Sequence, residues 1–137
     1  KHGYLEALRE NHIPIDRDLV VCDKIDFDVA RNATLRLLES ENRPDAILAF
    51  NDIITYAAFD AIKAKGLRIP EDVAIIGFTD GDTAAFVTPR LTAIMDQAHV
   101  QGTKACELLM RSIKGDDKIY KEVVPMILKI RESSEKN

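Results

Sequence analysis

Residues 73–82, VAIIGFTDGD, place candidate chemistry at the end of an apolar run. The run ends in the hydroxyl of Thr79 and the carboxylates of Asp80 and Asp82. Such a group could bind a metal ion, act as a catalytic acid, cap a helix or line one wall of a ligand cleft. An EF-hand calcium loop is excluded, because it would need an oxygen ligand where the sequence has Ala84.

Polar residues follow three other apolar runs in the same way. In open α/β sheets, ligands bind outside the carboxyl ends of the strands, so polar residues at those ends share one edge. Amides, hydroxyls and carboxylates gathered there suit a hydroxyl-rich or charged ligand. The four polar strand ends are Asp23, Asn51 with Asp52, Thr79 with Asp80, and Asp96 with Gln97.

Short apolar runs alternate with longer segments of helical spacing, and these elements must position the polar ends. Strands are expected at 19–22, 46–50, 73–78 and 91–95, and helices at 4–11, 26–41, 52–65 and 98–114. Residues 120–130 are expected to be extended, with Pro125 restricting their pairing. Continuous apolar strands between helices are typical of a parallel sheet buried on both faces, so the sequence predicts an α/β, doubly wound fold.

Two of the strand-end residues also have a purely structural interpretation. Asn51 and Asp80 each stand where a helix or turn begins, and Asn and Asp are among the best N-cap residues. Each could therefore cap a helix, contact a ligand, or do both.

Catalytic and cofactor motifs are missing from the sequence. It has no nucleophile elbow, no P-loop and no dinucleotide-binding glycine motif. A magnesium or phosphoacceptor site on Asp23, Asp52 and Asp80 is a lesser alternative, because no lysine at the end of a late strand supports it. We expect a protein that is not an enzyme and that uses no cofactor and no metal ion.

Composition excludes several other classes of protein. The chain has 137 residues, 46% of them hydrophobic and 31% charged, which is typical of a folded globular domain. Its net charge of −4 is unlike that of a domain that binds duplex DNA by itself, and no apolar run is long enough to cross a membrane. Cys22 and Cys106 are isolated in sequence, which favours buried, reduced thiols and a cytoplasmic protein. Because Lys1 is not methionine and a helix is already under way near it, we expect a piece of a longer chain.

Several motifs resemble those of the LacI/GalR family of bacterial transcription repressors. They keep their order and spacing over essentially the whole chain, which is more specific than any one motif. They are Phe50-Asn51-Asp52, the segment 69–78, Pro89-Arg90-Leu91-Thr92, Asp96-Gln97 through Gly102, Leu108-Leu109, and the ending 128–133.

The resemblance implies a two-lobed effector domain of periplasmic-binding-protein-like type I, carried behind a helix-turn-helix head. This chain looks like the C-terminal portion of that domain, mainly part of its second lobe. The helix at 98–115 would pack on a first lobe that lies outside the chain, as would the DNA-binding head. An effector bound between the lobes would alter how the paired DNA-binding heads bind operator DNA.

The resemblance also implies roles for residues at the sheet edge. Asn51 matches an asparagine that hydrogen-bonds a sugar hydroxyl in the family. Thr79 stands where many members have an aspartate, and this loss of charge would favour a sugar acid or sugar phosphate. Ile25 falls where members often have a stacking aromatic, with Phe27 close by as a substitute. The expected ligand-binding residues are Asp23, Ile25, Phe27, Asn51, Thr79 and Asp80.

By the same analogy, a homodimer would form through one side of the 52–65 helix and the segment 84–87. The expected interface residues are Ile53, Tyr56, Ala57, Asp60, Ala85 and Phe86. For Tyr56, the alternative is a role in the core. We therefore expect the effector-sensing and dimerisation part of a repressor. The alternatives are a transport-linked periplasmic sugar-binding protein of the same fold and an α/β phosphoacceptor or enzyme using Asp52 or Asp80.

Overall fold

The computed structural model describes residues 1–79 and 82–135. Its helices are α1 (His2–Glu10), α2 (Phe27–Glu39), α3 (Asp52–Ala64) and α4 (Ala98–Ile113), with a short 3-10 helix, η1 (Asp82–Ala85). Its strands are β1 (Ala46–Ala49), β2 (Ala74–Phe78), β3 (Thr92–Met95) and β4 (Ile127–Lys129). The α/β class predicted from the sequence is confirmed.

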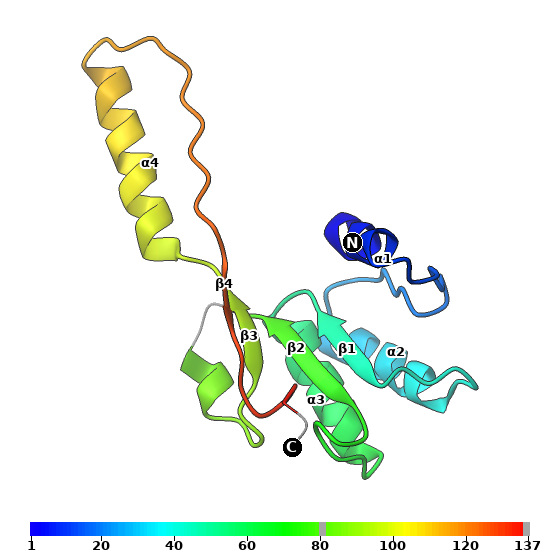
Figure 1. Ribbon diagram of the computed structural model, residues 1–137. Coiled ribbons are helices and arrows are strands. Elements are labelled where there is room, and N and C mark those ends of the chain that lie inside the picture. Colours follow the sequence, from blue (N-terminus) through cyan, green and yellow to red (C-terminus); the bar gives the residue numbers. More distant parts are fainter. Residues whose placement is uncertain (80–81, 136–137) are drawn as a thin grey trace.

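The strands form one sheet in the order β1-β2-β3-β4 (Figure 1). The first three are parallel, and β4 runs antiparallel to β3. The sheet is therefore mixed, and the prediction of a wholly parallel sheet is wrong for this last strand. After β3 the chain travels out along α4 and comes straight back, so β4 enters from the edge at which β3 ends and must run in the opposite direction.

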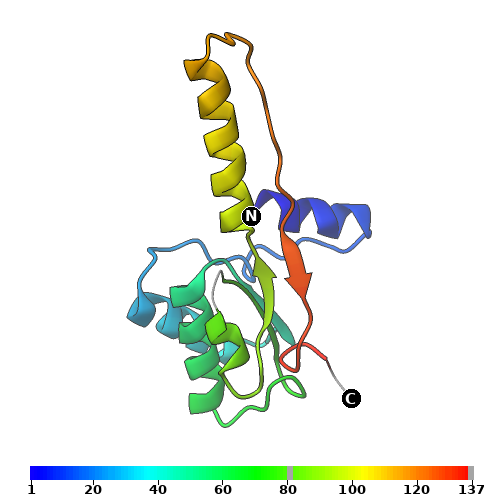
Figure 2. The same cartoon turned by 90° about the vertical axis from the view of Figure 1, so that its left-hand side faces the viewer.

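Helices α2 and α3 lie on the same side of the sheet (Figures 1 and 2). α3 packs on β1 and β2, and α2 packs on α3. Side chains alternate across the strands accordingly: Ile75 is fully buried in the core, whereas Leu48 is 49% exposed. The sheet face that carries Leu48 and its register partner Ile76 is left uncovered by these two helices.

The hydrophobic core lies between this helix pair and the sheet. α3 presents small residues, Ala57 and Ala61, that are fully buried, so its backbone can approach the strands closely. The larger core side chains come from α2, α3, the strands and the segments that precede β2 and β3. They are Leu38, Phe59, Ile62, Ile69, Val73, Ile75 and Leu91.

Local sequence signals set the helix ends. Asp26 caps α2 by accepting a hydrogen bond from the Val29 N–H at 3.0 Å. Gly66 follows α3 with φ +68, the left-handed conformation that glycine adopts most readily. The predicted boundaries of α2, α3 and α4 agree with these ends to within about two residues.

The predicted strand at 19–22 does not form. Leu19–Cys22 is irregular, and the sheet of the described residues ends at β1 on that side. An apolar run becomes a strand only when another strand satisfies its backbone hydrogen bonds, and no such partner lies beside this segment within residues 1–79 and 82–135.

The C-terminal turn, residues 131–134, is inserted at the starts of β2 and β3. Ser133 is fully buried, and its Oγ donates to the Ile75 carbonyl at 2.6 Å and accepts from the Thr92 N–H at 2.8 Å. Its backbone also accepts from the Ile75 N–H and donates to the Arg90 carbonyl, both at 2.9 Å. Ser133 therefore bridges β2 and β3 at the start of their ladder, whose first pair is Ile76 and Thr92.

Helix α4 and the return segment 114–126 form an arm that projects away from the sheet (Figures 1 and 2). No residue of α4 is buried, and Leu109 and Ile113 are 60% and 68% exposed. At the base of the arm, the Gln97 side chain donates to the Pro125 carbonyl at 2.7 Å and so joins its two ends. An amphipathic helix with no buried side chain is a surface for further packing.

Candidate ligand-binding site

Two of the predicted ligand-binding residues, Asn51 and Thr79, follow the carboxyl ends of the neighbouring strands β1 and β2. Ala49 pairs with Gly77 in the parallel ladder. This is the last pair of the ladder, and Asn51 and Thr79 each follow it by two residues. Asn51 keeps an extended backbone, with φ −150 and ψ 176, and lies near the sheet edge where the sequence predicts a ligand.

Asn51 is the N-cap of α3. Its Oδ1 accepts a hydrogen bond from the Ile54 N–H at 2.9 Å. A backbone N–H can meet only the oxygen of an amide, so this bond fixes which way the amide is turned. The Nδ2 group, with two donors, is then the part of the side chain left for a ligand.

Thr79 is more enclosed than a residue on an open cleft wall would be. It is 5% exposed, and its N–H donates to the Ile94 carbonyl at 3.2 Å. Its backbone therefore lies at the junction of β2 and β3. Asp80, the third polar residue predicted for this edge, lies outside the described residues.

Two aromatic side chains at the same edge were not predicted as site residues. The rings of Phe50 and Phe78 are 6.1 Å apart between centroids and tilted by 45°. Phe50 is 66% exposed. Each ring directly precedes a polar strand-end residue, Asn51 or Thr79, and that adjacency was the available sequence signal. The exposed Phe50 ring, which contacts the half-buried Phe78 ring and precedes an amide donor, is a surface on which a sugar ring can stack.

Asp52 begins α3 and carries the one buried side-chain oxygen that has no hydrogen-bond partner among the described residues, Oδ1. Its position in the first turn of α3 is favourable for a negative charge. The part of the chain that the structure describes contains no group of three His, Cys, Asp or Glu side chains that could hold a metal ion. Asp52 therefore has no described partner ligands with which to form a metal site.

The remaining three predicted ligand residues lie before and at the start of α2. Asp23 accepts a hydrogen bond from the neighbouring Lys24 N–H at 2.8 Å. Ile25 and Phe27 are 58% and 42% exposed. This segment therefore presents exposed side chains, and no hydrogen bond joins Asp23 to Asn51 within the described residues.

The residues predicted for a dimer interface divide between surface and core. Ile53 and Phe86 are 45% and 81% exposed, and Ala85 is also exposed. Tyr56 is half-buried, and its hydroxyl donates to Thr83 Oγ1 at 2.7 Å, which links α3 to η1. Ala57 is fully buried, so in the single chain it supports the core.

Asp60 also has a partner within the chain. Its Oδ2 accepts from Arg31 Nε at 2.6 Å, which ties α3 to α2. Ile53, Tyr56, Ala85 and Phe86 therefore remain as the candidate contact face.

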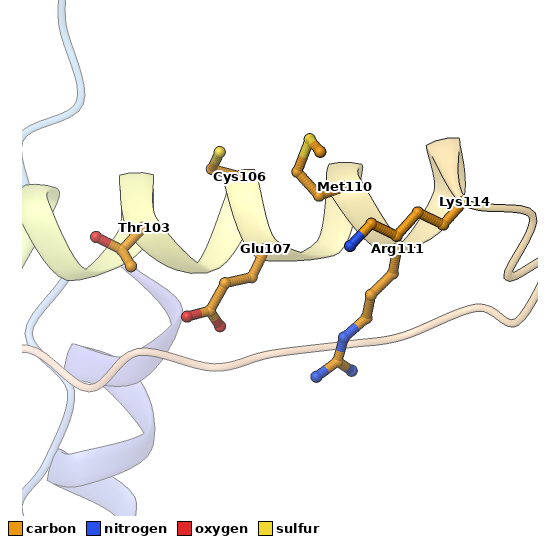
Figure 3. Close-up of a pocket in the computed structure, with 6 residues that line it drawn as sticks. All are labelled: Thr103, Cys106, Glu107, Met110, Arg111 and Lys114. Carbon is orange, nitrogen blue, oxygen red and sulfur yellow. The ribbon is translucent and has the colours of Figure 1, made fainter.

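A shallow hollow of about 500 Å³ runs along the arm (Figure 3). Every residue that lines it comes from α4 or its C-cap. The hollow is therefore the surface of one exposed helix, and it is not a cleft between two elements. It is lined by Thr103, Cys106, Glu107, Met110, Arg111 and Lys114.

Two carboxylates away from this edge are held by arginines. The Arg68 side chain and backbone N–H both bond Asp72, and together they lower the Asp72 pKa to about 2. Arg90 bonds Glu132 in the same way, through its backbone N–H and its guanidinium, and lowers the Glu132 pKa. Both pairs secure loops next to strands and do not face Asn51.

A sequence model of the periplasmic binding protein-like domain matches residues 1–134. The chain belongs to the periplasmic-binding-protein-like domain family. Its curated relatives include the probable HTH-type transcriptional repressor ExuR of Bacillus subtilis, 42% identical over 94 residues. They also include the HTH-type transcriptional repressor PurR of Vibrio atlanticus, 33% identical over 115 residues. These alignments cover 69% and 84% of this chain, but only 28% and 34% of the relatives.

Solved structures give the same result for this family member. A LacI-family regulatory protein from Chloroflexus aggregans superposes with a TM-score of 0.89 at 34% identity, over 97% of this chain and 48% of that one. The transcriptional regulator CelR, in complex with cellobiose, gives 0.86 at 31% identity, over 96% of this chain and 41% of that one. The chain thus spans about half the length of these structures, and its resemblance to LacI/GalR regulators is confirmed.

Proposed function

We propose that residues 1–137 form the effector-binding and dimerisation part of a LacI/GalR-type transcriptional repressor. The observation that carries the proposal is the match of residues 1–134 to a periplasmic binding protein-like domain, in whose sheet Asn51 and Thr79 each follow the last β1–β2 register pair by two residues. The relatives named above are transcriptional repressors and regulators, which favours regulation over catalysis. A phosphoacceptor role for Asp52 or Asp80 has no such support.

The proposed effector is a small sugar-derived molecule that offers hydrogen-bond acceptors. With Asn51 Oδ1 engaged by the helix cap, the amide presents donors, which match hydroxyl, carboxylate or phosphate oxygens. Thr79 adds no negative charge at that edge, so a sugar acid or sugar phosphate is favoured over a neutral sugar. A LacI-family regulator from Escherichia coli with 25% identity was solved with phosphate, and CelR with cellobiose, so both kinds of ligand occur on this fold.

The proposed domain organisation follows from the surfaces that are left uncovered. The arm of α4 has no buried residue, and one sheet face exposes Leu48 and Phe50. We assign α4 to packing on the first lobe, which lies outside residues 1–137, and the ligand cleft to the space between the lobes. Within the described residues, no helix is long and apolar enough to cross a membrane. A cytoplasmic homodimer that meets operator DNA through a separate head is the assembly this function requires.

The test uses the longest natural chain that contains residues 1–137. Glucose, glucuronate and glucose 6-phosphate are titrated by calorimetry into the native protein and into the Asn51→Ala variant. We expect an acidic probe to bind best and Asn51→Ala to weaken it about tenfold or more, since a buried hydrogen bond to a charged ligand is lost. Loss of the cap should cost about 1 kcal/mol of stability.

Asn51→Asp is the matched control, because aspartate also caps helices but offers no amide donors. It should retain the native melting temperature and still lose the acidic probe. Unchanged affinity in both variants would remove Asn51 from the site. A strict preference for glucose would overturn the assignment of an acidic effector.

A further inference from the structure

Thr55 lies one helical turn after Asn51 and is in direct contact with it. Its Oγ1 donates to the Asn51 carbonyl at 2.6 Å, and its backbone N–H donates to the same carbonyl at 2.9 Å. Thr55 is fully buried. A solvent-exposed threonine in a helix gains little from such a bond, but here two donors hold the residue that begins the helix.

The other side of Thr55 rests against β2. A Cβ added to Gly77 would lie 2.5 Å from Thr55 Cγ2 and 2.6 Å from Thr55 Oγ1, closer than any real Cβ contact. Glycine at this point therefore lets the strand approach the first turn of α3 as closely as it does. Gly77 is two residues before Thr79, so this contact joins the two halves of the candidate site.

Asn51 is thus restrained at two points. Its carbonyl is held by Thr55, and its side-chain Oδ1 is held by the Ile54 N–H. The first restraint fixes the backbone of the cap against β2, and the second fixes the amide on that backbone. Together they determine where the Nδ2 donors lie relative to the end of β2.

We propose that Thr55 is a positioning residue for Asn51. Its methyl group docks the first turn of α3 on Gly77, and its hydroxyl holds the Asn51 carbonyl, so the amide is ordered before a ligand arrives. The consequence for ligand binding rests on the proposed function. The ordering of Asn51 does not, and it can be measured without any ligand.

Thr55→Val is the informative variant, because valine keeps the shape and the contact with Gly77 but removes the hydroxyl. The Asn51 carbonyl keeps the Thr55 backbone N–H, so the fold should survive. Thr34→Val is the matched control. Thr34 is also buried and also donates to the carbonyl four residues before it, that of Ala30 at 2.9 Å, but it lies in α2. The two variants should lose similar stability.

The first measurement is the order parameter of the Asn51 side-chain amide, from ¹⁵N relaxation of asparagine-labelled protein. We expect a rigid amide in the native protein and in Thr34→Val. In Thr55→Val the order parameter should fall below the native value, and Thr55→Ser should restore it because serine keeps the hydroxyl. An equally rigid Asn51 amide in Thr55→Val overturns the inference.

The second measurement is calorimetric binding of glucuronate to the longest natural chain. Thr55→Val should weaken it by about fivefold or more, the loss expected when one ordering hydrogen bond of about 1 kcal/mol is removed, with Thr34→Val near native. Equal glucuronate affinities for these two variants would mean that Thr55 contributes to the fold and has no effect on ligand binding. If Asn51→Ala also leaves the affinity unchanged, the proposed ligand site fails, and the amide order parameter still decides the role of Thr55.

Discussion

Ser133 shows how a single buried hydroxyl can join two strands. Four hydrogen bonds connect it to Ile75, Arg90 and Thr92, and its side chain makes two of them. Ser133→Ala leaves the Thr92 N–H and one lone pair of Ile75 unpaired in the interior. The free energy of unfolding should fall by about 1–3 kcal/mol, the cost of a buried unsatisfied polar group.

Urea unfolding followed by circular dichroism measures this loss. Ser112→Ala, on the exposed side of α4, is the control and should unfold at the native midpoint. A native midpoint for Ser133→Ala as well would mean that water replaces the hydroxyl at no cost.

Asp72 makes a pH-dependent contribution through Arg68. Its pKa is lowered to about 2 in the folded protein, against roughly 3.9 in an unfolded chain. The Arg68–Asp72 interaction therefore stabilises the fold above about pH 4 and is lost as the pH falls through about 2.

Asp72→Asn should lower the urea midpoint near neutral pH and flatten its decline between about pH 4 and pH 2. Asp117→Asn, at an exposed position, supplies the comparison. Parallel pH profiles for the native protein and Asp72→Asn would contradict this role.

Single residues were predictable from sequence where the interaction is local. Asp26 and Asn51 cap helices that begin beside them, and residue type alone predicts this. Ser133 and Thr55 could not be identified in the same way, because their partners in β2 lie 58 and 22 residues away along the chain and depend on how the elements pack. Thr79 was predicted at the ligand edge, but its low exposure depends on β3 lying beside it.

At the scale of elements, the face formed by α3 and η1 is the candidate dimer contact. It exposes Ile53 and Phe86, and the Tyr56–Thr83 hydrogen bond holds its two parts together. In a two-fold interface the same patch is buried on both partners. A charged substitution there therefore buries two charges, one from each partner.

Tyr56→Asp should therefore weaken the dimer of the longest natural chain by tenfold or more, roughly the effect of 1.4 kcal/mol. Sedimentation velocity over a range of concentrations measures the dissociation constant. Tyr56→Phe controls for the hydroxyl. An unchanged dimer with native stability would place the interface elsewhere, and an unfolded variant would show that Tyr56 belongs to the core.

The elements themselves were predicted where periodicity and pairing agree. A clear apolar pattern and a packing partner within the chain are found for β1, β2, β3, α2 and α3. Helix α4 has the pattern and lies on the projecting arm. Leu19–Cys22 has the pattern but no partner strand, and β4 has weak pattern but pairs with β3. Apolar pattern is a local property, whereas strand formation requires a neighbour.

At the scale of the whole molecule, the arm and the sheet are joined at one narrow base. The chain enters the arm after β3 and leaves it before β4, and the Gln97–Pro125 hydrogen bond connects these two passages. None of the described side chains of α4 is buried against the sheet. The direction of the arm therefore depends on this base, and the Gln97 side chain is its cross-link.

Gln97→Ala should widen the range of directions that the arm adopts. A neutral hydrogen bond contributes about 1 kcal/mol. Its loss should change the ratio of molecules with a closed arm base to molecules with an open one by about fivefold. Cys106 on the arm and Cys22 on the body are both free and exposed, so the expectation that they are buried is wrong, and the native sequence already offers two sites for spin labels. Pulsed electron paramagnetic resonance on residues 1–137 measures the distribution of distances between the two labels. This distribution should broaden in Gln97→Ala. It should stay native in Gln101→Ala, an exposed position one turn along α4. Equal widths in all three proteins would mean that the strands alone fix the arm and that Gln97 has no part in aiming it.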